Sequence, residues 1–171
     1  GLRTVVDLNK IARTMVSNRR GILAADESIA TMSARLEKVG VEPTAETRRV
    51  YRELIVTTPE LADSISGVIL ADETFRQRVT DGRTFPDYLS DIGILTGIKV
   101  DTGAKPLAGA PNETVTEGLD GLRERVADYV RLGATFAKWR AVITIGDSTP
   151  TDRAVHANLH ALARYAGLCQ E

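Results

Sequence analysis

The chain has 171 residues, and its 43% hydrophobic and 26% charged content is typical of one globular domain with a sizeable core. A formal net charge of −1 gives no bulk electrostatic attraction to nucleic acid or to a membrane surface. The single cysteine, Cys169, excludes an intramolecular disulfide framework, and no apolar run approaches the roughly 18 residues that a membrane span requires.

The N-terminal part of the chain predicts helices that alternate with short apolar strands. Residues 2–19 carry apolar side chains mostly three and four positions apart, which is the spacing of an amphipathic helix. Continuous apolar runs indicate buried strands, while caps and stop residues mark the helix ends. The expected elements are a strand at 21–26, a helix at 28–39, a helix opened by Pro43 and Thr44, a strand at 67–71, a turn at Asp81-Gly82 and a short helix at 85–89.

The same alternation continues to the end of the chain. A Gly- and Thr-rich segment interrupts it, and we expect a loop there. A threonine cap followed by proline in the first turn is typical of a helix start, and it occurs at 149–152. The expected elements are a strand centred on 97–101, a loop at 102–118, a helix at 119–132, a strand at 136–145 and a last helix that begins near Thr149.

Each predicted helix carries an apolar stripe that should face the core. The stripes are Ile29, Met32, Leu36 and Val39; Val50, Tyr51, Leu54 and Ile55; Leu119, Leu122, Val126, Val130 and Leu132; and Val155, Leu159, Leu162, Ala166 and Cys169.

Four strands that are separated by helices indicate an α/β fold. Short strands that are apolar on both faces favour a parallel sheet with right-handed crossovers. An open doubly wound sheet and a (β/α)8 barrel both satisfy this order. Because a barrel usually needs about 250 residues, this chain would supply about half of one.

Charged residues stand late in these apolar strands, at Asp26, Lys99, Lys138 and Arg140. Strand side chains alternate between faces, so Lys138 and Arg140 should share one face while Trp139 packs toward the helices. The carboxyl ends of parallel strands are where ligands bind, and clustered cations favour an anion such as phosphate. A structural network of ion pairs is the alternative interpretation.

Six short motifs, in order along the chain, resemble class I fructose-1,6-bisphosphate aldolases. They are GILAADES at 21–28, RTFP at 83–86, GIKVD at 97–101, GLDGL at 118–122, FAKWR at 136–140 and LARYA at 162–166. The resemblance implies a (β/α)8 barrel, of which residues 1–171 form the N-terminal half of a single domain: the N-terminal helix and about the first four βα units. It also implies reversible cleavage of fructose 1,6-bisphosphate to dihydroxyacetone phosphate and glyceraldehyde 3-phosphate, in glycolysis and gluconeogenesis.

The resemblance further assigns roles to individual residues. Catalysis in this family uses a lysine Schiff base and no metal or other cofactor, and the imine-forming lysine is expected beyond Glu171. Ala34 departs from the family, which often has a lysine there. The implied catalytic residues are Asp26 and Lys138, and the implied substrate- or phosphate-binding residues are Ser28, Thr31, Arg35, Lys99 and Arg140.

The implied partners are a sugar bisphosphate, the C-terminal half of the barrel and further copies of the chain in a homotetramer. Residues 1–171 alone are expected to be inactive, and a non-catalytic half-barrel that acts as a binding or assembly module is the alternative. We expect a cytoplasmic location without nucleic-acid or membrane partners, although a removed presequence stays open. His156 and His160 have zinc-compatible spacing, but no third ligand is evident and solvent-facing positions are favoured.

Overall fold

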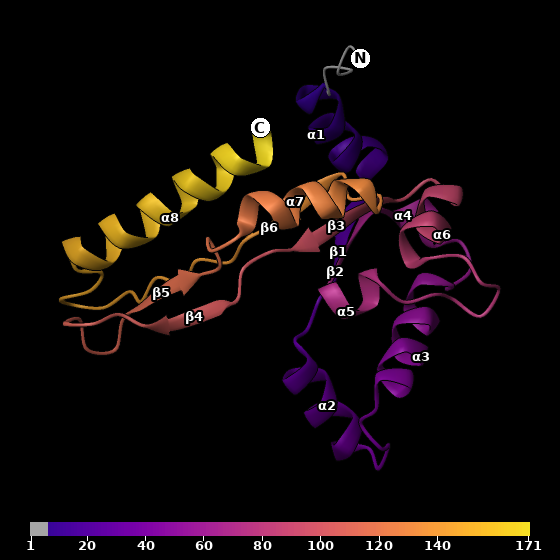
Figure 1. Cartoon of the computed structure of the whole chain (residues 1–171), viewed down its shortest axis with the longest axis horizontal. Helices are drawn as coiled ribbons and strands as arrows, with labels where there is room; N and C mark the ends of the chain where they lie inside the picture. The colour runs from indigo at the N-terminus through magenta and orange to yellow at the C-terminus, as the bar shows by residue number, and fades with distance from the viewer. Residues whose placement is uncertain (1–6) are drawn as a thin grey trace. The chain divides into compact units, whose positions relative to one another are not determined.

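The computed structural model describes residues 7–171, which fall into two compact units. The first unit holds the chain up to Ile98 together with Leu132–Phe136, and the second holds Lys99–Arg131 and Ala137–Glu171 (Figure 1). The start of the predicted N-terminal helix, at 2–6, lies outside the described residues. None of the helices in residues 7–171 is long and apolar enough to cross a membrane.

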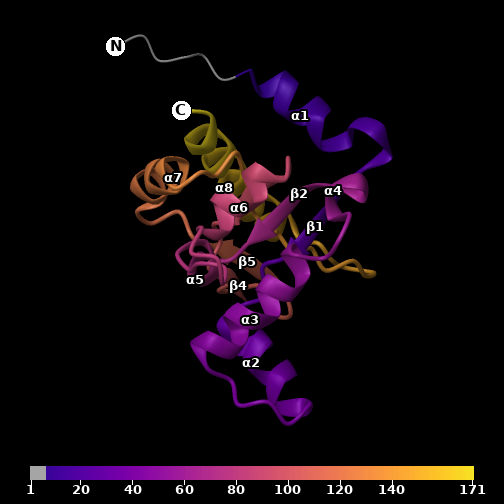
Figure 2. The ribbon, with the colours of Figure 1, turned by 90° about the vertical axis from the view of Figure 1, so that its right-hand side faces the viewer.

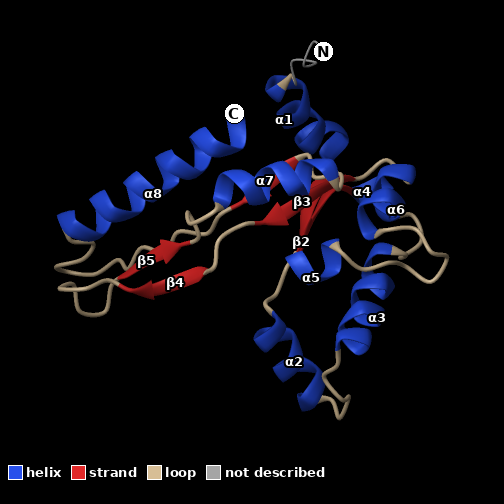
Figure 3. Cartoon of the chain, viewed as in Figure 1, coloured by secondary structure: helices blue, strands red, loops and turns tan. Residues whose placement is uncertain are grey.

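Helices separate the strands of the main sheet as predicted, but two further strands lie between residues 102 and 118, where a loop was expected (Figure 3). The elements are α1 (Leu8–Val16), a 3-10 turn (Ser17–Arg19), β1 (Gly21–Ala25), α2 (Ile29–Lys38), α3 (Ala45–Val56), α4 (Leu61–Ser64), β2 (Ile65–Leu70), α5 (Asp72–Phe75), α6 (Phe85–Asp91), β3 (Leu95–Lys99), β4 (Gly103–Pro106), β5 (Thr114–Glu117), α7 (Leu122–Arg131), β6 (Phe136–Lys138) and α8 (Asp152–Gln170).

One sheet has the strand order β1-β2-β3-β6, and its pairs β1/β2 and β2/β3 are parallel. Ala25 pairs with Leu70, and Leu70 pairs in turn with Ile98, so the strands stay in register toward their carboxyl ends. The α/β fold class with a parallel sheet is therefore confirmed. The strand predicted at 136–145 is too long, however, because β6 ends at Lys138.

The core of the first unit includes apolar side chains of the sheet and of α6. Val68 and Leu70 on β2 and Phe85 and Leu89 on α6 are completely buried. α1 docks on the same unit through the Ser66 hydroxyl, which donates to the Met15 carbonyl. Helices α2 and α3 lie side by side (Figures 1 and 2), and a hydrogen bond of 3.3 Å joins Arg48 Nη1 to Ser33 Oγ.

The ring of Phe136 covers two glycines on neighbouring strands of the first unit. A Cβ atom added to Gly67 would lie 3.1 Å from Phe136 Cε1, and one added to Gly97 would lie 2.9 Å from Phe136 Cδ2 and nearer still to Cε2 and Cζ. The ring therefore occupies space that any other residue at 97 would need.

Two of the predicted inward stripes in the first unit are wrong in part. Met32 and Leu36 are buried as expected, but Ile29 and Val39 on the same stripe are exposed. On α3, Val50 and Leu54 are exposed, whereas the residue that lies inward beside Val56 is Arg52. The prediction for α3 was wrong because the buried Arg52 binds main-chain carbonyls of the turn after β1, at Ala25 and Glu27, and apolar side chains are not what lies there.

The second unit contains a hairpin where a loop was predicted. β4 and β5 pair antiparallel, with Gly103 opposite Glu117 and Pro106 opposite Thr114. α8 packs on β5, and the Asn158 side chain donates to the Thr114 carbonyl at 2.9 Å. This amide replaces the apolar contact that a helix stripe would normally make.

The start and the inner face of α8 differ from the prediction. The cap is Thr151, so Pro150 precedes the helix and does not lie in its first turn. The buried face carries Ala154, Asn158, Ala161 and Leu168, while Leu159, predicted inward, is 57% exposed.

The stripe predicted for 119–132 is also only partly right. α7 begins at Leu122, which is buried, and Tyr129 rather than the exposed Val130 completes the buried face.

Candidate functional site

Asp26 follows the last residue of β1 and is only 7% exposed. The chain then turns directly into α2, and Ser28 caps that helix: its hydroxyl accepts from the Thr31 N–H at 3.1 Å and donates to Thr31 Oγ1 at 3.0 Å. Ser28 and Thr31 are exposed, so their hydroxyls and the first turn of α2 face solvent. A helix start of this kind favours a negatively charged ligand.

Arg35 is paired with the Glu27 carboxylate, which was not among the predicted site residues. Its Nη1 lies 2.7 Å from Glu27 Oε1, and the Arg35 side chain is 56% exposed. Glu27 lies between Asp26 and Ser28, so Arg35 is bound to the same turn that carries the predicted catalytic carboxylate.

A buried arginine, Arg52, lies beneath this turn and was also missed. Its Nε donates to the Ala25 carbonyl at 2.7 Å and its Nη2 to the Glu27 carbonyl at 3.0 Å. Burial lowers the pKa of Arg52, and attraction to the Glu27 and Asp26 carboxylates opposes that shift. Arg52 lies four residues before the buried Val56 on α3, so helical periodicity places both side chains on one face. Periodicity predicts apolar residues on a buried face, and a buried arginine was therefore not expected.

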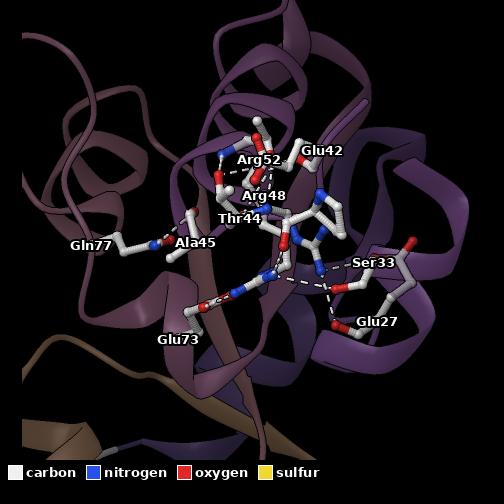
Figure 4. Close-up of polar contacts among 11 residues, drawn as sticks. Glu27, Ser33, Glu42, Thr44, Ala45, Arg48, Arg52, Glu73 and Gln77 are labelled. Atoms are coloured by element: carbon white, nitrogen blue, oxygen red, sulfur yellow. Dashed lines mark hydrogen bonds and ion pairs between the residues drawn. The ribbon is translucent and has the colours of Figure 1, made fainter. Parts of the chain in front are cut away.

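Arg48, one turn earlier on α3, makes the neighbouring ion pair. Its Nε and Nη2 donate to the two Glu73 carboxylate oxygens at 2.8 and 2.7 Å (Figure 4). The hydrogen bonds to Glu73 raise the pKa of Arg48, although burial opposes them. This two-point pair fixes α3 to α5 at the position from which Arg52 projects.

In the second unit, Asp101 organises the chain around two predicted cations. Its side chain is 3% exposed, and Lys99 Nζ lies 4.0 Å from Asp101 Oδ1. The same carboxylate accepts from the Gly103 N–H at 3.1 Å and from the Arg140 N–H at 3.2 Å. The role of Asp101 was not predicted, because a buried acceptor of backbone N–H groups leaves no periodic pattern in the sequence.

Lys138 ends β6 and is half-buried, and its carbonyl accepts from the Val100 N–H at 3.1 Å. Arg140 stands two residues beyond the strand and is exposed, so it is not a buried strand cation as predicted. Trp139 is buried and stacks on Tyr165 of α8, with ring centroids 5.3 Å apart, which confirms that it faces a helix.

The predicted site residues thus form two groups. Asp26, Ser28, Thr31 and Arg35 lie in the first unit, and Lys99, Lys138 and Arg140 lie in the second. His156 and His160 are exposed on α8. Within residues 7–171, no three histidine, cysteine, aspartate or glutamate side chains are close enough to hold a metal ion.

A protein-family model for fructose-bisphosphate aldolase class-I matches residues 7–171. The chain belongs to the class I fructose-bisphosphate aldolase family. A probable class 1 aldolase of Xylella fastidiosa is 57% identical over 98% of this chain and 50% of the relative, and aldolase C-B of Danio rerio is 50% identical over 96% of this chain and 46% of the relative.

Aldolases of known structure share the fold. A Plasmodium falciparum fructose-bisphosphate aldolase, crystallised with TRAP and a small-molecule inhibitor, superposes with a TM-score of 0.90. It is 42% identical, and the match covers 94% of this chain and 47% of that one. The chain spans about half the length of the curated aldolases it matches, so its described strands correspond to part of an aldolase barrel.

Proposed function

We propose that the protein containing this chain is a fructose-bisphosphate aldolase that cleaves fructose 1,6-bisphosphate reversibly through a Schiff base. The observation that carries the proposal is the match of all described residues to the class I family model. An identity of 57% with a probable class 1 aldolase supports the same chemistry.

The chemistry needs an electron sink and a base. A lysine forms an imine with the substrate ketone, and the protonated imine accepts the electron pair of the breaking carbon–carbon bond. A base removes the proton of the hydroxyl next to that bond, so the aldehyde product leaves as its carbonyl forms. Protonation of the remaining enamine and hydrolysis of the imine then release dihydroxyacetone phosphate. We propose that the imine-forming lysine lies in the half of the family's length that this sequence does not span.

Asp26 is the proposed base, because it is a mostly buried carboxylate directly after β1. Lys138, at the end of β6, is the proposed cation that supports imine chemistry. Lys99 and Arg140 are proposed to contact the substrate. The Asp101 carboxylate accepts from the Arg140 backbone N–H and lies near the Lys99 ammonium.

Ser28, Thr31 and Arg35 are the proposed phosphate-binding group. The exposed hydroxyls at the start of α2 supply donors, while Arg35 is already paired with Glu27. A phosphate would therefore compete with a carboxylate for the Arg35 guanidinium. We further propose that the active protein is a homotetramer located in the cytoplasm.

The test uses the protein encoded by the complete gene that contains this sequence. We expect cleavage of fructose 1,6-bisphosphate that EDTA does not reduce, and borohydride with dihydroxyacetone phosphate should trap an adduct on one lysine. Asp26→Asn should lower kcat by about 10²–10⁴-fold. It should not prevent adduct formation, since dihydroxyacetone phosphate lacks the hydroxyl on which Asp26 acts.

Asp63→Asn is the matched control, because Asp63 is an exposed carboxylate on α4. It should leave kcat unchanged. If the intact protein shows no cleavage and forms no adduct, the proposal is overturned and a non-catalytic assembly module is favoured. Activity that EDTA abolishes would assign a metal-dependent mechanism instead. Sedimentation of the same sample tests the tetramer.

A further inference from the structure

We propose that Arg52 is a positioning residue that holds the Asp26 carboxylate in its reactive orientation, an inference that rests on the proposed function. The two main-chain carbonyls that Arg52 binds belong to Ala25 and Glu27, the residues on either side of Asp26. The guanidinium therefore binds the Ala25–Asp26 and the Glu27–Ser28 peptide groups, at 2.7 and 3.0 Å, and fixes the chain on both sides of the predicted base.

The planar shape of arginine suits this task. Nε and Nη2 point in fixed directions, so two carbonyls that both accept from them are held in one relative orientation. An ammonium group is a single point charge on a flexible stem and cannot reproduce that two-point contact. A change in the backbone torsion angles of Asp26 would move one carbonyl relative to the other and break one of the two hydrogen bonds.

Burial makes the contact rigid. The Arg52 side chain is 3% exposed, and Nη2 also lies 3.2 Å from Glu27 Oε2. Nη1 approaches the sulfur of Met32, a completely buried residue of α2. A cation is costly to remove from water, so a buried arginine persists only where its donors are matched. Neutralising that charge would require only Glu27, whereas the carbonyl contacts serve the backbone around Asp26.

The part of α3 that carries Arg52 is itself held in place. α3 begins with a capping box between Thr44 and Thr47, and Arg48 one turn before Arg52 is fixed to Glu73 of α5. Figure 4 shows Arg48 and Arg52 with Glu73 and Glu27 among their neighbours. The position of Asp26 is thereby set by a helix some 25 residues later in sequence, as the separations of 25 and 27 residues in these hydrogen bonds record.

Arg52→Lys tests this role in the intact protein. A displacement of the base by about 1 Å can cost about 10²-fold in rate, so we expect kcat to fall by that order while KM changes less than about threefold. Rates are expressed per site trapped by borohydride and dihydroxyacetone phosphate, so misfolded molecules do not count. Arg52→Gln, which loses the charge as well, should be at least as impaired per trapped site.

Arg49→Lys is the control, because Arg49 lies on the same helix and binds Glu46, Glu53 and the Arg78 carbonyl but not the β1–α2 turn. Its kcat per trapped site should equal that of the wild type.

The decisive comparison is a double-mutant cycle with Asp26→Asn. If Arg52 acts through Asp26, Arg52→Lys should lower kcat by less than about threefold once Asp26 is replaced. Equal losses in both backgrounds, or a full kcat in Arg52→Lys, would overturn the proposal while leaving the aldolase assignment intact. An inactive wild-type protein would overturn both.

Discussion

Gly97→Ala should destabilise the protein, because Phe136 leaves no room for a methyl group. The added Cβ would lie 2.9 Å from Phe136 Cδ2 and closer to two other ring atoms. Contacts of a Cβ atom shorter than 3.0 Å essentially never occur in proteins. Without the ring, alanine would favour a strand over glycine by about 0.5–1 kcal/mol. Overpacking typically costs about 1–3 kcal/mol, so the net change should be destabilising.

Two glycines in the same unit calibrate this effect. At Gly67 the new Cβ would lie 3.1 Å from Phe136 Cε1, a contact that a small ring movement relieves, and at Gly21 it would meet nothing within 4 Å. Stability should therefore fall in the order Gly21→Ala, Gly67→Ala, Gly97→Ala. For a chain of this length, each kcal/mol corresponds to about 2–4 °C in the midpoint of thermal unfolding.

The assay is thermal unfolding followed by circular dichroism, repeated in a Phe136→Ala background. Removing the ring should abolish the cost of Gly97→Ala and leave the strand preference of alanine, a gain of about 0.5–1 kcal/mol, because the clash is the whole cause of the destabilisation. A Gly97→Ala protein as stable as Gly67→Ala, or a cost that persists without the ring, would refute the reasoning.

Two further predictions concern the glutamates Glu113 and Glu53. Glu113→Gln should cost about 1–3 kcal/mol, because the buried Glu113 carboxylate accepts from the Thr151 N–H at 2.9 Å and its hydroxyl at 2.7 Å; urea unfolding against the exposed control Glu117→Gln checks this, and equal midpoints would contradict it. The pKa of Glu53 is lowered: burial acts to raise it, but hydrogen bonds from Thr80 and Arg49 prevail. Its contribution to stability is therefore present above its ordinary pKa of about 4.5 and is lost as pH falls through the lower folded value. The difference in unfolding midpoint between wild type and Glu53→Gln should shrink below pH about 4.5, and a difference that grew at acid pH would have the wrong sign.

Local signals in the sequence predicted the fold class and most element positions. The strand at 21–26 and the turn at Asp81-Gly82 were located by apolar runs and by glycine, both of which act over a few residues. Trp139 was oriented correctly by strand alternation alone. The assignment of the seven site residues to roles stays a prediction, since it came from resemblance to a family.

Features that depend on distant partners were not predictable from local patterns. Arg52 is buried because it donates hydrogen bonds to the Ala25 and Glu27 carbonyls, and the sequence of α3 gives no sign of these distant acceptors. Asn158 likewise lies inward because Thr114 on β5 offers a carbonyl. The hairpin itself was missed because its four-residue strands contain glycine, proline and threonine, which also mark loops.

The return of Leu132–Phe136 to the first unit has a consequence for synthesis on the ribosome. Phe136 covers Gly67 and Gly97, so this unit cannot finish packing until residue 136 has left the exit tunnel. At about 5–20 residues per second, the 38 residues after Ile98 add a delay of about 2–8 s. During that interval the faces of β2 and β3 that the ring later covers stay open to chaperones.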